Sequence, residues 1–213
     1  MEAKKISKSV LKRLPGYLTY LKSLPEESGA HISATALATA LGMGEVQVRK
    51  DLAMVSDGGR PKIGYVRSTL VEDIEQFLGY DNTTDAVLIG AGKLGQALLD
   101  YKGFDEFGLN ILAAFDSNPA TEKTISGKPV YHISNLEQFC KANKVLMGII
   151  TVPADAAQEV ADQLIAGGIK AIWTFASTHL EVPANILVQY ENMATSLAVL
   201  SVHLQAQIKE EKK

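Results

Sequence analysis

The sequence predicts an α/β chain of two domains: a helix-turn-helix domain at the amino terminus and a doubly wound parallel sheet behind it. Three observations predict this fold class. Three amphipathic helix patterns, the last two separated by a glycine turn, occupy the first 55 residues. From residue 85 onward, short apolar runs alternate with amphipathic segments, the order typical of βαβ units. The first apolar run leads directly into glycines at positions 90, 92 and 95.

The first three helices are marked by apolar spacing and by their end signals. Residues 6–24 place apolar side chains at i, i+3, i+4 and i+7. Ser33 is the expected N-cap of a short helix at 34–41, which Gly42 ends. A third helix is predicted at about 45–54. The short glycine turn between the last two helices indicates helix-turn-helix geometry.

The third helix is the predicted recognition helix, which in this motif enters the major groove of double-stranded DNA. Its inner face is expected to hold the apolar side chains of Val46, Leu52 and Val55. Its outer face is left with the polar side chains of Gln47, Arg49 and Lys50. Together with Ser33, these three are expected to contact DNA.

A glycine-rich segment follows the recognition helix. Residues 56–65 read SDGGRPKIGY, a composition that suits a β-hairpin wing with a flexible tip. The further DNA-binding residues expected here are Arg60, Lys62 and Tyr65. Residues 71–78 are predicted to be a helix and residues 79–84 a linker, so the DNA-binding domain is expected to span residues 1–80.

The second domain is expected to span residues 85–192, with a carboxyl-terminal segment at 193–213. Its strands are predicted at 86–90, 109–116, 144–152, 170–175 and 186–188. Three helices are predicted within it: from the glycine loop to about Tyr101, at about 134–143 and at 154–166. A last helix is predicted from 193 to about 209, where leucines and an isoleucine form an apolar stripe.

The glycine triplet has the context of a dinucleotide-binding loop. It reads Gly90-Ala91-Gly92-Lys93-Leu94-Gly95, follows a predicted strand and opens a predicted helix. In such a loop Gly90 permits the tight turn, Gly92 lets backbone amides approach a pyrophosphate, and Gly95 lets helix and strand pack closely.

The residue that ends the second strand indicates which dinucleotide binds. Asp116 follows Gly95 by 21 residues (116 − 95), where a carboxylate can accept hydrogen bonds from both hydroxyls of the adenine ribose and repels a 2′-phosphate. NAD⁺ and NADH are therefore the expected cofactors. Thr151, Val152 and Pro153 end a later strand and are expected to face the cofactor, and Phe175 is expected near the nicotinamide.

Charge and composition limit the surroundings of the protein. Residues 1–70 carry 11 basic against 6 acidic residues (+5), whereas residues 81–213 carry 10 against 15 (−5), so a basic head precedes an acidic body. Cys140 is the single cysteine, which excludes an intramolecular disulfide and a cysteine-based zinc site; no metal is expected. No apolar stretch approaches the roughly 18 residues of a membrane span, so a cytoplasmic location and no membrane partner are expected.

The candidates for acid–base chemistry are few, which favours a sensor over an enzyme. No tyrosine is followed four residues later by lysine, and of the four histidines only His179 lies near a strand exit. Two alternatives remain open. In the first, the chain is a small NAD-dependent oxidoreductase with a basic amino-terminal extension. In the second, it is a DNA-binding module whose second domain holds another nucleotide or none.

Four segments resemble the Rex family of redox-sensing repressors. They are ISKSVLKRLPGYLTYL, GEVQVRKDL, the glycine-rich wing with Tyr65, and IGAGKLGQAL with FDSNP, TVP and GIKAIW behind it. The resemblance implies a homodimer with a winged-helix domain and a Rossmann domain, whose last helix is exchanged between subunits. It also implies that NADH releases the protein from palindromic operator DNA.

The resemblance carries individual roles as well. Arg49 and Lys50 match the recognition-helix residues at base edges and phosphates. Arg13 matches a first-helix position near the hinge between the domains, and Tyr101 matches a tyrosine that links cofactor state to dimer arrangement. Asn192 and Met193 stand where relatives have an acid and an aromatic residue, and the wing SDGGRPKIGY departs from the family pattern.

Overall fold

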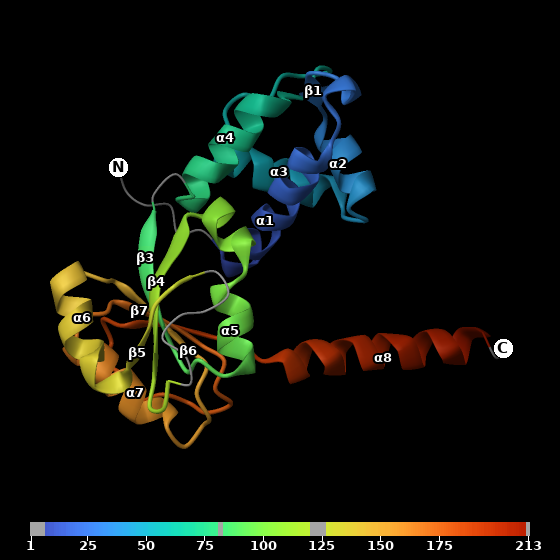
Figure 1. Cartoon of the computed structure of the whole chain (residues 1–213). Coiled ribbons are helices and arrows are strands. Elements are labelled where there is room, and N and C mark those ends of the chain that lie inside the picture. Colours follow the sequence, from blue (N-terminus) through green and yellow to red (C-terminus); the bar gives the residue numbers. More distant parts are fainter. Residues whose placement is uncertain (1–6, 81–82, 120–126, 212–213) are drawn as a thin grey trace. The chain divides into compact units, whose positions relative to one another are not determined.

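The computed structural model describes residues 7–80, 83–119 and 127–211 (Figure 1). The chain divides into two compact units, Met1–Asn82 and Thr83–Lys213. They are called unit 1 and unit 2 below, and each is described by itself.

Unit 1 is helical with one small antiparallel sheet. Its elements are α1 (Lys8–Ser23), the 3₁₀ helix η1 (Glu26–Ser28), β1 (His31–Ile32), α2 (Ala34–Ala40), α3 (Glu45–Val55), β2 (Tyr65–Val66) and α4 (Arg67–Leu78). Strand β1 pairs with β2, with Ile32 opposite Tyr65. Ser33 caps α2 as predicted, because its side chain accepts a hydrogen bond from the backbone N–H of Ala36 at 3.0 Å.

The core of unit 1 is built from one face of each longer helix. The fully buried large side chains are Leu14, Tyr17, Leu18 and Leu21 of α1, Leu37 of α2, Leu52 of α3, and Leu70 and Ile74 of α4. Each such burial stabilises the fold by roughly 1.5–3 kcal/mol before the entropy of ordering is counted. These contacts fix α3 against α1 and α4, and so define which of its faces stays exposed.

The buried face of α3 and the start of α4 differ from the sequence expectation. Val46 is not on the inner face of α3: it is 66% exposed, and Val48 is buried in its place, because Val48 and Leu52 are one helical turn apart. Helix α4 begins at Arg67 rather than at residue 71. Tertiary contacts extend it, since the Arg67 backbone N–H donates to Ala30 O and its guanidinium donates to Pro25 O.

The wing is a closed loop rather than a hairpin of two strands. Arg60 and Gly64 exchange backbone hydrogen bonds of 2.9 Å, which close the loop around residues 61–63. The next residues pair not with the preceding segment but with β1. Gly64 is required at this junction, because its φ is +89° and a Cβ there would lie 2.3 Å from the Ile32 carbonyl oxygen.

Unit 2 is a parallel sheet of six strands in the order β5-β4-β3-β6-β7-β8. The strands are β3 (Thr84–Ile89), β4 (Leu109–Asp116), β5 (Val130–His132), β6 (Met147–Ile150), β7 (Ala171–Thr174) and β8 (Leu187–Tyr190). The helices are α5 (Lys93–Leu99), η2 (Lys102–Phe107), η3 (Ile133–Asn135), α6 (Leu136–Asn143), α7 (Ala157–Ala166) and α8 (Met193–Glu211). Figure 1 shows α6 and α7 on one face of the sheet and α5 on the other. The predicted doubly wound sheet is confirmed.

The strands depart from the predicted ranges, most clearly at β5, β6 and β8. Strand β5, with His132 at its end, was not predicted, because its three residues are too short for a periodic signal. Strand β6 is shorter than the predicted 144–152, because Lys144 takes a left-handed conformation (φ +53°) that ends α6. Strand β8 ends at Tyr190, two residues beyond the predicted end (190 − 188).

Cys140 lies fully buried in the core between α6, α7 and the sheet. Burial raises the pKa of its thiol to about 11. We expect native protein at pH 8 to resist alkylation by iodoacetamide, and denatured protein to take up one equivalent, as read by mass spectrometry. Rapid alkylation of the native chain would show that this part of the core opens.

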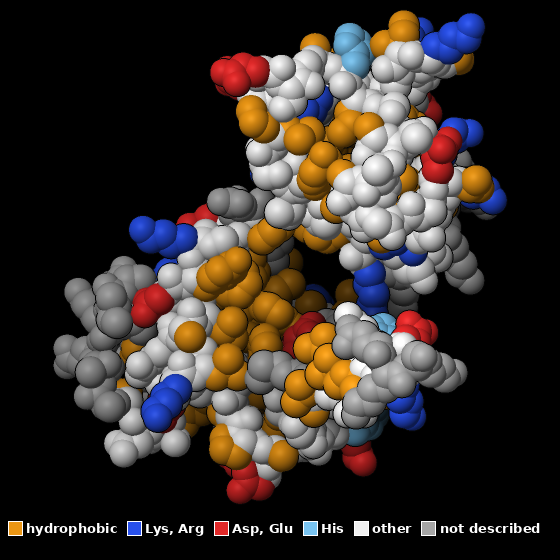
Figure 2. Space-filling view, turned by 90° about the vertical axis from the view of Figure 1, so that its right-hand side faces the viewer, with side chains coloured by type: hydrophobic (Ala, Val, Ile, Leu, Met, Phe, Trp, Pro, Cys, Tyr) orange, Lys and Arg blue, Asp and Glu red, His pale blue; other side chains and the backbone are white. Residues whose placement is uncertain are grey.

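The last helix has no covering element among the described residues. Its large apolar side chains, including Leu197, Leu200 and Leu204, are exposed. Figure 2 shows hydrophobic side chains along α8 and on the surface of unit 2. Yet among the described helices none is long and apolar enough to cross a membrane.

Candidate nucleotide pocket and DNA-binding surface

The glycine loop joins β3 to α5 through a turn that larger residues would block. Gly90 has a φ of +100°, and a Cβ at Gly95 would lie 1.9 Å from the Gly90 carbonyl oxygen. At Gly92, by contrast, an added Cβ meets nothing within 4 Å. The backbone at Gly92 therefore faces open space at the start of α5, where a phosphate can approach backbone N–H groups.

A pocket of about 360 Å³ opens beside this loop. Six of the predicted cofactor residues line it: Gly90, Gly92, Asp116, Thr151, Val152 and Pro153. Seven further lining residues had no sequence signal: Ile89, Ser117, Ile133, Ala156, Glu159, Val160 and Gln163. Those from α7 could be found only once the fold placed that helix beside the strand ends.

Thr151 ties the glycine loop to the end of β6. Its hydroxyl lies 2.7 Å from the Gly90 carbonyl oxygen and 2.9 Å from that of Ile89, and its backbone N–H donates to Ile89 O at 2.8 Å. A Cβ on Gly90 would lie 3.0 Å from the Thr151 side chain. The side chain and backbone of Thr151 thus fix the glycine loop against the end of β6.

Asp116 holds the same loop from the other side. Its Oδ2 accepts from the Ala91 N–H at 2.7 Å, and its Oδ1 accepts from the Asn118 N–H at 2.8 Å. A carboxylate has about four acceptor positions, so two bonds leave capacity for ligand hydroxyls. The geometry adds a role for Asp116, because this carboxylate also shapes the loop.

The other predicted cofactor residues lie outside this pocket lining. Lys93 and Leu94 are exposed in the first turn of α5, and Ala91 packs with the cluster on the α5 face of the sheet. Phe175 belongs to that cluster too, with its ring 4.8 Å from the ring of Trp173.

In unit 1, a hollow of about 480 Å³ lies between α2, α3 and the wing. Five of the predicted DNA-binding residues line it: Ser33, Arg49, Arg60, Lys62 and Tyr65. Its three basic side chains make it suited to a phosphate backbone. Lys50 is exposed on α3 outside the lining.

Arg49 and Gln47 have partners inside unit 1. The Arg49 guanidinium pairs with Glu45 one turn earlier in α3. With its amide oriented by the hydrogen-bond network, Gln47 Oε1 accepts from Arg13 Nε at 2.9 Å and Nη1 at 3.1 Å. Gln47 therefore faces α1, whereas Arg49 remains exposed enough to exchange Glu45 for a phosphate or a base.

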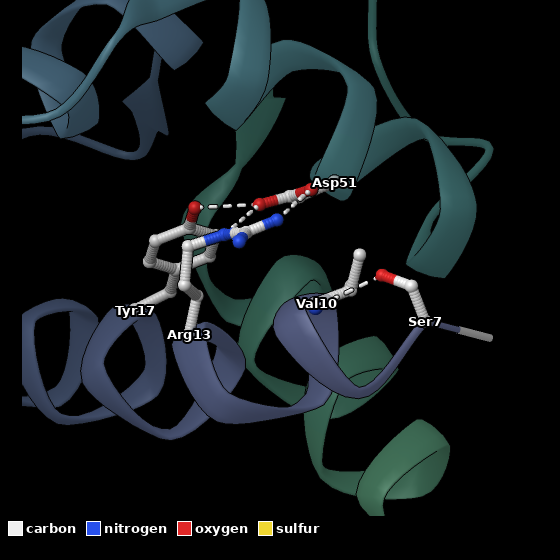
Figure 3. A network of polar contacts seen from close by, with 5 residues as sticks. All are labelled: Ser7, Val10, Arg13, Tyr17 and Asp51. Carbon is white, nitrogen blue, oxygen red and sulfur yellow. Dashed lines mark hydrogen bonds and ion pairs between the residues drawn. The ribbon is translucent and has the colours of Figure 1, made fainter.

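A polar network links α1 to the recognition helix (Figure 3). Arg13 donates from Nε and Nη2 to the two carboxylate oxygens of Asp51, at 2.7 and 2.9 Å, and the Tyr17 hydroxyl donates to the same carboxylate at 2.8 Å. Asp51 is only 3% exposed. Sequence reasoning missed this residue, although it falls near the inner face of α3, where a charged side chain needs a partner.

Tyr17 is predicted to make the stability of unit 1 fall at alkaline pH. Burial, and after it the hydrogen bond to Asp51, raise the pKa of Tyr17 from 10.0 to about 12. The folded chain therefore keeps a proton that the unfolded chain loses, so this stabilisation is complete below pH 10 and disappears between about pH 10 and 12. We expect the urea midpoint of unit 1 to fall across that window.

Tyr17→Phe is the control for this pH effect. The variant should have a flatter profile above pH 10, with a remaining slope from Tyr65 and Tyr80, whose pKa values burial also raises. Equal slopes in both proteins would remove Tyr17 as the cause.

Tyr101, a predicted switch residue of unit 2, belongs to a row of aromatic rings. The Tyr101 ring is 55% exposed and lies 4.9 Å from Phe104, which lies 5.7 Å from Trp173. Trp173 Nε1 donates to Glu191 at 3.1 Å.

Asn192 is exposed and caps α8, since its side chain accepts from the Thr195 N–H at 3.2 Å. Met193 begins α8, and its side chain is outside the described part.

A helix-turn-helix unit and a nucleotide-type pocket in one chain define a class: DNA-binding regulators that carry a nucleotide-binding domain. Two family models match accordingly, "Putative DNA-binding protein N-terminus" over residues 5–53 and "CoA binding domain" over residues 81–178.

Curated relatives and solved structures narrow this class. The redox-sensing transcriptional repressor Rex of Porphyromonas gingivalis is 42% identical over 197 residues, covering 92% of this chain and 90% of its own. That of Bacteroides fragilis is 37% identical, covering 93% and 91%. This chain belongs to the Rex family of redox-sensing transcriptional repressors.

Solved Rex-family structures match over nearly the whole chain. The crystal structure of RSP with β-NAD⁺ and operator DNA has a TM-score of 0.87 and 34% identity, covering 99% of this chain and 97% of that one. RSP with β-NADH has a TM-score of 0.86 and 33% identity, covering 99% and 100%.

Proposed function

We propose that this chain represses transcription as a homodimer on palindromic operator DNA and leaves the operator when NADH fills the pocket of unit 2. One observation carries the proposal. A pocket lined by Gly90, Asp116 and Thr151 lies at a glycine loop of the dinucleotide-binding type, in a chain whose other unit presents a basic hollow beside α3. The solved RSP complexes, with β-NAD⁺ and operator DNA and with β-NADH, support both ligands.

The residues of the pocket fit NAD(H). Gly92 leaves room for the pyrophosphate at the start of α5, and Asp116 keeps acceptor positions for the ribose hydroxyls. A 2′-phosphate would meet the Asp116 carboxylate, which disfavours NADP(H). The redox state is carried by the dinucleotide, which is either NAD⁺ or NADH, and the residues of the pocket only bind this dinucleotide.

On the DNA side, the proposed contacts divide by chemistry. Arg49 and Lys50, on the exposed face of α3, serve base edges and phosphates. Ser33, Arg60, Lys62 and Tyr65 line the adjacent hollow and are assigned to the backbone. Gln47 is committed to Arg13 and reaches DNA only if it leaves that bond.

The exposed apolar stripe of α8 supports a dimer, because a solvated helix with Leu197, Leu200 and Leu204 exposed is unfavourable. We propose that this helix is exchanged with the partner subunit. Arg13, Tyr101, Asn192 and Met193 are the proposed switch residues. For NADH to change the spacing of two recognition helices, it must bind the two dimer arrangements unequally.

The test is fluorescence anisotropy on a palindromic duplex, with NADH and NAD⁺ compared at one stated salt concentration. NADH should weaken operator binding and NAD⁺ should not; a tenfold loss corresponds to about 1.4 kcal/mol of coupling. Equal affinity with and without saturating NADH would remove the sensor function.

We also propose that the chain binds NADH without consuming it, and acts in the cytoplasm. NADH absorbance should stay constant with alcohol and aldehyde substrates. Steady turnover that survives replacement of Arg49 and Lys50 would instead support a small oxidoreductase.

A further inference from the structure

The recognition helix carries one exposed apolar side chain that no contact within unit 1 explains. Val46 is 66% exposed, the highest value among the large hydrophobic side chains described in unit 1. It lies in the first turn of α3, after Gly44 at the N-cap and Glu45. The amino-terminal residues of a recognition helix are those that contact base edges.

The position of Val46 around the helix places it in the middle of the outward face. At about 100° per residue, Arg49 falls about 60° to one side of Val46 and Lys50 about 40° to the other. Ala53 completes this face and is exposed. Val48 and Leu52 point into the core, and Gln47 and Asp51 turn toward Arg13 of α1.

We propose that Val46 is a specificity-determining residue that contacts the 5-methyl group of a thymine in each operator half-site. The thymine methyl is the one apolar group that base pairs present in the major groove, and apolar side chains recognise it. A β-branched valine in a helix has essentially one rotamer, so little entropy is lost when the contact forms. The inference rests on the proposed function, because it requires α3 to enter the major groove.

Deoxyuridine in place of thymidine tests this contact at the level of one methyl group. An operator selected by the chain from a randomised palindromic library is resynthesised with each thymine in turn replaced symmetrically by deoxyuridine. For one thymine per half-site, wild-type affinity should fall about fourfold per methyl lost, or about 15-fold for both half-sites. Anisotropy at fixed salt measures the affinity.

Val46→Ser and Met54→Ser complete the experiment. Val46→Ser should bind the thymine operator about as weakly as wild type binds the deoxyuridine operator, with no further loss on deoxyuridine. Its salt dependence should equal that of wild type, since no phosphate contact is removed. Met54, 41% exposed at the other end of α3, is the matched control, and its variant should respond to deoxyuridine like wild type.

The outcomes separate the two proposals. If wild type selects and binds an operator but no deoxyuridine substitution weakens this binding, the thymine contact is wrong and the repressor function stands. The same conclusion follows if deoxyuridine lowers the operator affinity of Val46→Ser as much as it lowers that of wild type. If wild type binds no duplex, the proposed function fails and the contact fails with it.

Discussion

Gly95→Ala is expected to abolish NADH binding and to destabilise unit 2. The added Cβ would lie 1.9 Å from the Gly90 carbonyl oxygen and 3.0 Å from the Leu88 side chain, and a backbone oxygen cannot rotate away. Either α5 separates from β3 or the glycine loop changes shape. Overpacking of this kind costs about 1–3 kcal/mol or more. Because Trp173 is the single tryptophan, its fluorescence during urea unfolding reports unit 2 specifically.

Gly92→Ala is the matched variant that separates folding from binding. Its Cβ meets no protein atom within 4 Å, so the urea midpoint should match that of wild type. The methyl group would, however, occupy the place where the pyrophosphate approaches the backbone, so NADH affinity should fall by at least tenfold in calorimetry. Operator binding by this variant should persist and become insensitive to NADH.

The pair of glycine variants has a clear contrary outcome. If Gly92→Ala binds NADH as tightly as wild type while Gly95→Ala does not, the dinucleotide does not pass over the glycine loop. The loss at Gly95 would then be a folding defect alone, and the cofactor residues at Asp116 and Thr151 would need another explanation.

The sequence predicted those parts of the fold that depend on local pattern. Strand β4 spans residues 109–116, as predicted, because eight apolar-rich residues between two turns leave little alternative. The glycine loop was recognisable because each glycine has a separate steric reason, and two of these reasons, at Gly90 and Gly95, are visible as close contacts. Asp116, predicted from its place at the end of the second strand and its spacing from Gly95, lines the pocket.

What the sequence could not predict depends on contacts between distant segments. Valines at 46 and 48 both fit an apolar periodicity, and only packing against α1 and α4 decides which is buried. Asp51 falls near the inner face of α3, but its partner Arg13 lies 38 residues away in the sequence and only the fold brings the two together. The wing reads as a hairpin because the local pattern does not contain its actual partner, β1.

Asp51→Ala should destabilise unit 1 at the contact between α1 and α3. It leaves the Arg13 guanidinium and the Tyr17 hydroxyl without their shared acceptor at a site where Asp51 is 3% exposed. Removing the acceptor of a buried hydrogen-bond donor costs about 1–3 kcal/mol, and the Arg13 side chain, which is 20% exposed, keeps part of its hydration. Operator affinity should fall in parallel, since the same carboxylate fixes α3 against α1. Hydrogen exchange of the backbone amides of α1 and α3 measures the loss of stability at these two helices.

The double variant Arg13→Met/Asp51→Leu decides whether the loss comes from an unpaired charge or from missing contacts. Two apolar side chains remove both charges together, and such replacements of buried ion pairs are often neutral. We therefore expect most of the hydrogen-exchange protection lost in Asp51→Ala to return. Protection as low as in the single variant would mean that the bidentate geometry itself, and not the pairing of charges, holds the recognition helix. Recovery of protection without recovery of operator affinity would instead assign Arg13 and Asp51 the task of orienting α3 on DNA.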